Sequence, residues 1–260
     1  MNMHQTTPLL FLICLLPACQ STGSVVLETS SDTGAATTDV GTNPSPVTGT
    51  ETETATETEP EPDECEGLQF QFDQGADGFT HAASDEAFDD PWELGEPDGE
   101  RCYSGDSCWN TRLDGDYGDC EAGYILSPTI DLSACADPDQ RVVVQFWHLY
   151  RFEEASSDTL WDGGLVQFSD DDGSTWRDTS PDPAYDGIIE GNYGECGATP
   201  EIDGHEAWSE IIRGDSWTQV QIPVSADYRT AEFRIRFLFG SDRAVTDTGW
   251  YIDDVEIRTE

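Results

Sequence analysis

The chain has 260 residues and a formal net charge of −43, because 54 aspartates and glutamates stand against 11 arginines and no lysine. A surface of this sign repels nucleic acid and anionic lipid, and it attracts cations. The composition therefore excludes nucleic acid as a partner. Whether a cation is bound depends on particular residues.

The N-terminal residues predict an export signal. Residues 9–16, LLFLICLL, are an apolar run of eight, whereas a bilayer core of about 30 Å needs roughly 20 residues. The run is followed by LPACQS, with a small residue before Cys19, as at the end of a signal peptide. This stretch resembles the lipobox of bacterial lipoproteins, although no Lys or Arg precedes the apolar run.

That resemblance implies a lipoprotein signal peptide over residues 1–19 and lipidation of Cys19. It places the protein in the cell envelope, at the outer membrane or the cell surface, with the lipid anchor as its only membrane contact. The alternative is an ordinary signal peptide in which Cys19 is incidental.

Residues 20–64 predict a disordered Thr/Glu/Pro-rich linker. The segment includes TGTETETATETEPEPDE and carries ten acids and no base. With so few aromatic and large aliphatic residues, it cannot bury enough apolar surface to offset its chain entropy. We expect a flexible tether with an end-to-end distance of roughly 35–40 Å.

Residues 65–260 predict one all-β domain. The segments LQFQF (68–72), TQVQIPV (218–224) and FRIRFLF (233–239) place an apolar residue at every second position, which is the period of a strand. The longer apolar runs RVVVQFWHLYRF and GYILSPTIDL are typical of central strands. We expect a jelly-roll-like β-sandwich of antiparallel strands, preceded by the disordered tether.

Six cysteines fall in this domain, and in an exported protein they predict three disulfides. Sequence alone does not fix the pairing, but the short spacing of Cys102 and Cys108 favours that bond first, and Cys120 with Cys135 next. A zinc site is disfavoured because the chain has no C-x-x-C pair. The six are Cys65, Cys102, Cys108, Cys120, Cys135 and Cys196.

Residues 169–176, SDDDGSTW, fit the Asp-box pattern S-x-D-x-G-x-T-W. In that pattern an aspartate side chain holds a hairpin turn, and here the motif follows the strand-like run GGLVQF. Asp-boxes occur in sialidases and in many β proteins without enzymatic activity. The motif indicates architecture and not catalysis.

Six segments taken in order resemble a known kind of extracellular domain. They are FDQGADGFT, CWNTRLDGDY, LSPTIDLS, VVQFWHLY, DGGLVQFSDDDGSTW and GWYIDDVEI. The pattern is similar to the β-sandwich appended to bacterial immune-inhibitor-A-type metallopeptidases and to the MAM domain of animal cell-surface proteins. The resemblance covers most of residues 68–258 and implies a jelly-roll-like adhesion or recognition module, which in some relatives holds a structural cation.

The last of these segments carries Asp253 and Asp254 side by side. Successive strand residues point to opposite faces, so one carboxylate is expected to point towards the core, where it would be protonated, hydrogen-bonded, paired with an arginine or bound to a metal. Arg234 or Arg236 on a neighbouring strand is one candidate. The resemblance implies the other, a structural calcium linking Asp73, and with it Asp77, to one or both of the twin acids; calcium prefers oxygen ligands of this kind.

The chain carries no H-E-x-x-H or G-x-S-x-G motif, so we do not expect an enzyme. We expect a non-catalytic module that recognises a glycan or a protein outside the cell. The alternatives are a hydrolase using a pair of carboxylates, as glycosidases do, and a purely architectural envelope lipoprotein. The aromatic residues in loop-like sequence are the candidate ligand contacts, namely Trp161, Trp208, Tyr185 and Tyr193.

Overall fold

The computed structural model describes residues 68–153, 159–209 and 216–260. The predictions for the signal peptide (1–19), for Cys19, for the linker (20–64) and for Cys65 lie outside these residues. The two described helices are short 3-10 turns, η1 (Ser133–Cys135) and η2 (Ala226–Tyr228). Neither has the length or apolar character that crossing a bilayer requires.

Six antiparallel strands form sheet I, which runs in the order β11-β6-β13-β4-β3, with β1 also paired to β13. The long strand β6 lies between β11 and β13 and is buried over most of its length, as its continuous apolar run predicts. The strands are β1 (Leu68–Phe70), β3 (Glu93–Gly95), β4 (Cys108–Asn110), β6 (Val142–Arg151), β11 (Thr218–Val224) and β13 (Gly249–Thr259).

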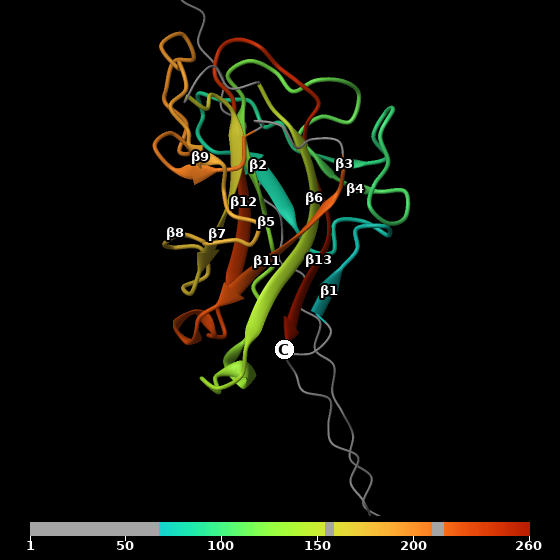
Figure 1. Ribbon diagram of the computed structural model, residues 1–260, viewed down its shortest axis with the longest axis vertical. Helices are drawn as coiled ribbons and strands as arrows, with labels where there is room; N and C mark the ends of the chain where they lie inside the picture. Colours follow the sequence, from blue (N-terminus) through green and yellow to red (C-terminus); the bar gives the residue numbers. More distant parts are fainter. Residues whose placement is uncertain (1–67, 154–158, 210–215) are drawn as a thin grey trace, which may run out of the picture. The chain divides into compact units, whose positions relative to one another are not determined.

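Sheet II has five antiparallel strands in the order β2-β5-β12-β7-β8. A small separate pair joins β9 (Gly187–Ile188) to β10 (Glu206–Ala207). Figure 1 shows the two main sheets facing one another, so the predicted sandwich of antiparallel strands is confirmed. The strands of sheet II are β2 (Thr80–Ala83), β5 (Ala122–Leu126), β7 (Gly163–Ser169), β8 (Arg177–Asp178) and β12 (Arg234–Gly240).

The main core lies between the sheets and follows from the period of two in each strand. On β12 and just before it, Phe233, Ile235, Phe237 and Phe239 all point into this core, as predicted. Val220, Ile222 and Val224 of β11 meet them from sheet I. Fully burying side chains of this size contributes roughly 1.5–3 kcal/mol each, so the alternating strands provide the main stabilisation of the sandwich.

A second, smaller core covers the outer face of sheet II. Leu165 and Leu238 stand on the faces of β7 and β12 opposite Val166 and Phe237, and they pack against Ile189 and Ile202. The segment 180–204 is therefore folded onto the sheet over much of its length.

Two disulfides have both of their cysteines among the described residues. Cys102 is bonded to Cys108, as predicted. Cys120 is bonded to Cys196 across 76 residues, so the prediction that it pairs with Cys135 is wrong. Cys135 is disulfide-bonded as well. The physical reason is the second core, which brings the segment carrying Cys196 back onto sheet II.

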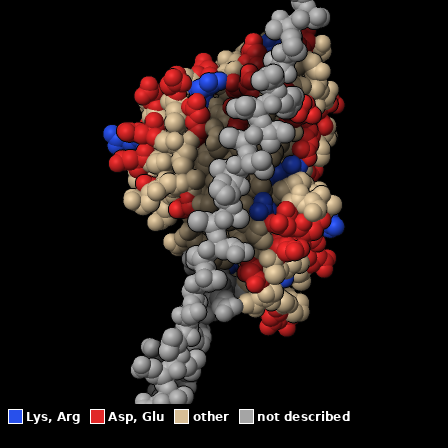
Figure 2. Space-filling view, turned by 180° about the vertical axis from the view of Figure 1, so that it is seen from behind, with Lys and Arg blue, Asp and Glu red and all other residues tan. Residues whose placement is uncertain are grey.

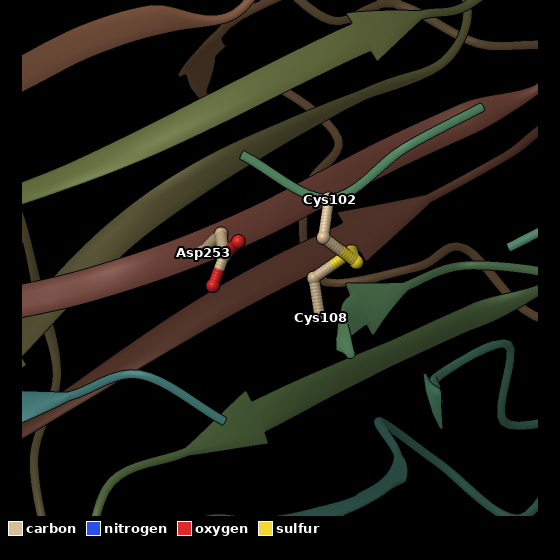
Figure 3. A group of neighbouring side chains, drawn as sticks. All are labelled: Cys102, Cys108 and Asp253. Atoms are coloured by element: carbon tan, nitrogen blue, oxygen red, sulfur yellow. A yellow bond between two sulfur atoms is a disulfide. The ribbon is translucent and has the colours of Figure 1, made fainter. Parts of the chain in front are cut away.

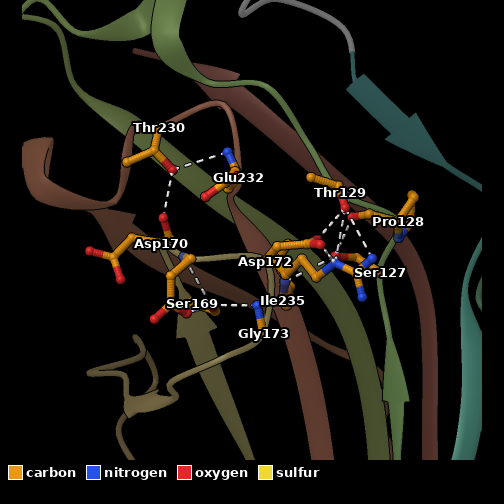
Figure 4. A network of polar contacts seen from close by, with 12 residues as sticks. Ser127, Pro128, Thr129, Ser169, Asp170, Asp172, Gly173, Thr230, Glu232 and Ile235 are labelled. Carbon is orange, nitrogen blue, oxygen red and sulfur yellow. Dashed lines mark hydrogen bonds and ion pairs between the residues drawn. The ribbon is translucent and has the colours of Figure 1, made fainter.

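The Asp-box hairpin between β7 and β8 is formed as the motif predicts. Asp171 accepts hydrogen bonds from the backbone N–H of Thr175 at 2.8 Å and from the Thr175 hydroxyl at 2.8 Å. The Ser169 hydroxyl accepts a hydrogen bond from Gly173 N at 2.9 Å. The Thr230 hydroxyl, from the segment between η2 and β12, donates to Asp170 O (Figure 4). The contacts among residues 169–175 hold the turn, and Thr230 joins the turn to the segment that precedes β12, which agrees with an architectural role.

Candidate functional site

The twin acids of β13 sit on a β-bulge. Asp253 is opposite Trp147 and Glu256 is opposite Gln145, so three steps along β13 match two steps along β6. The extra residue, with Asp254 at a positive φ of 46°, lets the strand bury both Ile252 and Val255 in the core. Both carboxylates are thereby left on the outer side of sheet I, so the expectation that one of them points into the core is wrong.

A short loop closed by the Cys102–Cys108 disulfide covers the bulge, and we call residues 102–108 the disulfide loop. Ser104 donates its backbone N–H to Asp253 Oδ2 at 3.0 Å and its hydroxyl to Asp254 Oδ1 at 2.9 Å. Asp106 N donates to Asp73 Oδ1 at 3.2 Å. Three carboxylates from the two ends of the domain sequence therefore hold one loop.

Gly105 shows how closely the loop approaches these acids. A Cβ at this position would lie 1.5 Å from Asp73 Oδ1, and the residue has a φ of +54°. Both the close approach and the backbone angle favour glycine. The disulfide loop is thus seated directly on the carboxylate of Asp73.

Asp253 is fully buried, and the disulfide loop contacts it through the backbone N–H of Ser104. Its pKa is raised to about 7, mainly by burial and also by the charges of Asp254 and Asp73, against the opposing effect of the hydrogen bonds from Ser104 N and Asp254 N. Burial also raises the pKa of Asp254. Figure 3 sets Asp253 beside the two cysteines, but their sulfurs are bonded to one another and offer no thiolate to a metal.

Neither predicted arginine partner reaches the twin acids. Arg234 pairs with Asp172 at 2.7 Å, and Arg236 pairs with Glu201 and donates to Gln167. The reason is topological, because both arginines lie on β12 of sheet II. The prediction that one of them neutralises an inward aspartate is wrong.

Of the four acids predicted to bind calcium, three gather at the disulfide loop and one does not. Asp77 Oδ2 accepts hydrogen bonds from Gln71 N at 2.9 Å and Phe72 N at 3.0 Å, which fixes the turn after β1. Asp73, Asp253 and Asp254 influence one another electrostatically. The geometry gives no support to the prediction that Asp77 binds calcium together with these three acids.

The disulfide loop places Tyr103 flat on Trp147 of β6. The two ring centroids are 3.9 Å apart with an interplanar angle of 10°, and Trp217 stands edge-on to Tyr103 at 6.1 Å. Trp217 is held in turn by donating its indole N–H to Arg101 O at 3.0 Å. We call Tyr103, Trp147 and Trp217 the aromatic platform. Tyr103 is 42% exposed. Among the described residues, it is the aromatic one of the large hydrophobic side chains that are exposed.

A shallow polar groove of about 100 Å³ adjoins the aromatic platform and shares Trp147 with it. Its lining includes three glutamines, and two of them are oriented by neighbours: Gln69 donates to Glu256 at 3.3 Å, and Gln145 accepts from Gln221 at 3.2 Å. The lining residues of this polar groove are Gln69, Gln71, Gln145, Trp147, Asp254, Val255 and Glu256.

The aromatic residues predicted as ligand contacts lie elsewhere. Trp208 is only 1% exposed, and Tyr193 is buried in the second core, so the expectation that they stand open to a ligand is wrong. The Tyr185 hydroxyl is bonded to Val166, and the ring packs against Trp208. Trp161 is half-buried, and its carbonyl accepts a hydrogen bond from Tyr193. Trp208 belongs to the main core, where it packs against Phe146, His148 and Trp250, whereas Tyr193 belongs to the second core.

The sequence does contain a signal for the aromatic platform. In RVVVQFWHLYRF one alternate set is Val142, Val144, Phe146, His148 and Tyr150, and the other holds Gln145, Trp147 and Arg151. The second set carries the polar residues, so it marks the outward face and Trp147 with it. Tyr103 has no such signal, because its position depends on the disulfide loop.

A second group of acids was not anticipated from the sequence. Carboxylate oxygens of Glu153, Asp162 and Asp242 lie within 4.8 Å of one another, and we call these residues the acid triad. Asp162 is fully buried, and it accepts hydrogen bonds from Tyr117 at 2.7 Å and from Asp242 N at 2.6 Å. Burial raises the pKa of Asp162 to about 8 and that of Glu153 to about 7, and the charge of Asp242 adds to both shifts.

No protein-family model and no curated protein matches the chain. Among solved structures it is similar to the K1 cleaved adhesin domain of Lys-gingipain from Porphyromonas gingivalis W83, with 16% identity, a TM-score of 0.39 and coverage of 74% of this chain and 96% of that one. It is also similar to TmCBM61 in complex with β-1,4-galactotriose, with 14% identity, a TM-score of 0.37 and coverage of 73% and 94%. Likenesses this distant do not identify a ligand, and membership of the MAM or immune-inhibitor-A-type families stays a prediction.

The acid triad predicts that stability falls as the pH rises through neutrality. Folded Asp162 keeps its proton up to a pKa of about 8, while an unfolded aspartate releases it near ~3.9. The folded state therefore binds more protons in between, and the free energy of unfolding drops with rising pH. From about pH 6.5 to 8.5 the loss due to Asp162 is on the order of 2 kcal/mol, or several degrees in Tm.

Thermal melts across this range provide the measurement, with Asp162→Asn as the matched variant whose profile should be flatter. Buried His148, whose pKa is lowered to about 3 by burial, has the opposite influence. That influence acts only below about pH 6.5, where an unfolded histidine takes up a proton. A Tm that is constant or rises from pH 6.5 to 8.5 in the wild type would contradict the assignment.

Proposed function

We propose that this chain is a non-catalytic recognition module, displayed on the cell envelope by a lipidated Cys19 and a disordered linker. Its ligand, a glycan or a protein, binds on the outer face of sheet I. The observation that carries the proposal is the stack of exposed Tyr103 on Trp147, which the disulfide loop holds at the surface. Exposed aromatic rings with a rigid support are a common feature of binding surfaces.

Two of the three carboxylates whose pKa is raised to about 7 or 8 do not favour the alternative of a hydrolase. A general acid must reach the scissile bond of its substrate. Asp162 and Asp253 are both fully buried, and both are hydrogen-bonded to groups within the fold. Their raised pKa values follow from burial under protein, so recognition without catalysis is the better account of these groups.

Binding to a broad glycan array and to extracellular protein fractions tests the proposal. Trp147→Ala should weaken any binding at least tenfold, because it removes the support of the aromatic platform. Trp176→Ala is the matched control, since Trp176 lies against Arg236 on the other sheet and should leave binding unchanged. Turnover of a bound ligand, or binding that depends on Trp176 and not on Trp147, would contradict the proposal.

The proposal includes the structural calcium expected from the sequence, with Asp73, Asp253 and Asp254 as its carboxylates. Support comes from the three carboxylates that gather at one loop, where the charges of Asp73 and Asp254 raise the pKa of Asp253 and the charge of Asp73 raises that of Asp254. Calcium prefers carboxylate and carbonyl oxygens, and a cation here would offset the repulsion among these groups and bind the disulfide loop to β13.

Excess Ca²⁺ should therefore raise the Tm above its value in excess chelator, because a ligand of the folded state stabilises it by mass action. Asp253→Asn should abolish the difference. The measurement is a pair of melts for each protein, together with the metal content of the purified chain. Equal Tm values and no bound metal would contradict the calcium proposal. The hydrogen bonds alone would then connect the disulfide loop to β13.

A further inference from the structure

We propose that the ligand of the outer face of sheet I is a neutral polysaccharide, with one sugar ring stacked on Tyr103 and the following units lying along the polar groove. This inference rests on the recognition function proposed above and specifies its ligand class. It follows from the aromatic platform, from the amides beside it and from the charge around both.

The aromatic platform offers a flat apolar surface to solvent. One face of the Tyr103 ring is occupied by Trp147, and 42% of the residue remains exposed. A pyranose ring has a face of C–H groups that is apolar and of similar size, and stacking the two removes both from water. Because stacked Trp147 and hydrogen-bonded Ser104 already fix Tyr103, little conformational entropy is lost on binding.

The polar groove supplies groups suited to hydroxyls. Each glutamine side chain has two N–H donors and a carbonyl acceptor, and a sugar hydroxyl can both donate and accept. Gln69 and Gln71 are exposed, and Gln69 uses one donor on Glu256, which leaves it further hydrogen-bonding capacity. The polar groove shares Trp147 with the aromatic platform, so a chain molecule can occupy both at once.

The charge of this surface favours a neutral polysaccharide over an anionic one. The polar groove includes Asp254 and Glu256 and contains no arginine in its lining, and the protein has no lysine at all. Figure 2 shows the same excess of acidic over basic side chains on the face of the domain that it displays. A uronic acid, sulfated or phosphorylated chain would be repelled by these charges.

A basic peptide is the competing occupant of an acidic surface, and the local hydrogen bonds favour the sugar. Asp254 accepts from Ser104, and Glu256 accepts from Gln69, so one oxygen of each carboxylate is already engaged by the protein. The polar groove also offers the neutral amides of exposed Gln69 and Gln71. Neutral hydroxyls match these better than ammonium or guanidinium groups do.

Affinity electrophoresis with defined soluble polymers tests this inference. The full chain should be retarded by at least one of four neutral polysaccharides, xyloglucan, galactomannan, laminarin and arabinoxylan, and not by polygalacturonate or alginate. Tyr103→Phe, which keeps the ring, should bind like the wild type. The double variant Tyr103→Ala, Trp147→Ala should bind at least tenfold more weakly, because it removes both the exposed ring and the ring that supports it.

The double variant is first compared with the wild type by circular dichroism and Tm, and Ile188→Ala serves as a control for loss of exposed apolar surface elsewhere. Stronger retardation by the anionic polymers, undiminished binding by a folded double variant, or no retardation by any of the four neutral polymers would overturn the inference. Trp147-dependent binding to an oligo-arginine peptide or to a protein instead would overturn the sugar assignment and leave the proposed recognition function standing.

Discussion

The outer face of sheet I depends on the hydrogen bonds that join the β13 bulge to the disulfide loop. The bulge turns Asp253 and Asp254 outward together, and both are bonded to Ser104, one through its backbone N–H and the other through its hydroxyl. Tyr103 is the neighbour of Ser104 in the chain, so fixing one residue fixes the other over Trp147. A buried carboxylate is costly unless it is hydrogen-bonded, and in this fold the bonds that satisfy Asp253 also build the exposed surface. Asp253 lies on the outer side of sheet I and accepts these hydrogen bonds, so its position does not require a positively charged partner.

The acids of this domain fall into groups with different physical roles. Asp171 and Asp77 accept backbone N–H groups and fix turns, and hydrogen bonding lowers the pKa of Asp171. Asp253 and Asp162 are buried and have their pKa raised, to about 7 and about 8. The first kind stabilises the fold in its ionised form, whereas the second is easier to bury with a proton or beside a cation. A chain with 54 acids can thus use the same residue type to hold a hairpin, to seat a loop and to make stability depend on pH.

How far the sequence predicts this structure depends on whether a regular period holds. Phe233 to Phe239 alternate without a break, and the prediction that they form one face of a strand is confirmed. The bulge at Asp254 inserts one residue, so alternation assigned a twin acid to the wrong side. The pairing of Cys120 with Cys196 depends on how the segment 180–204 folds over sheet II, and the buried position of Trp208 depends on its packing in the main core. Both are long-range contacts that local patterns do not encode. The outward position of Trp147 could be predicted from the polar residues at alternate positions of its strand, whereas the position of Tyr103 could not be predicted.

Amide hydrogen exchange at Ser104 tests the central interaction most directly. If Asp253 holds the disulfide loop, the Ser104 amide is protected in the wild type and exchanges much faster in Asp253→Ala. The amides of Ile257 and Phe237, in the cores of the two sheets, should keep their protection and report that the fold is intact. A Ser104 amide that exchanges at the rate of an unprotected peptide in the wild type, or equally slowly in both proteins, would contradict the account.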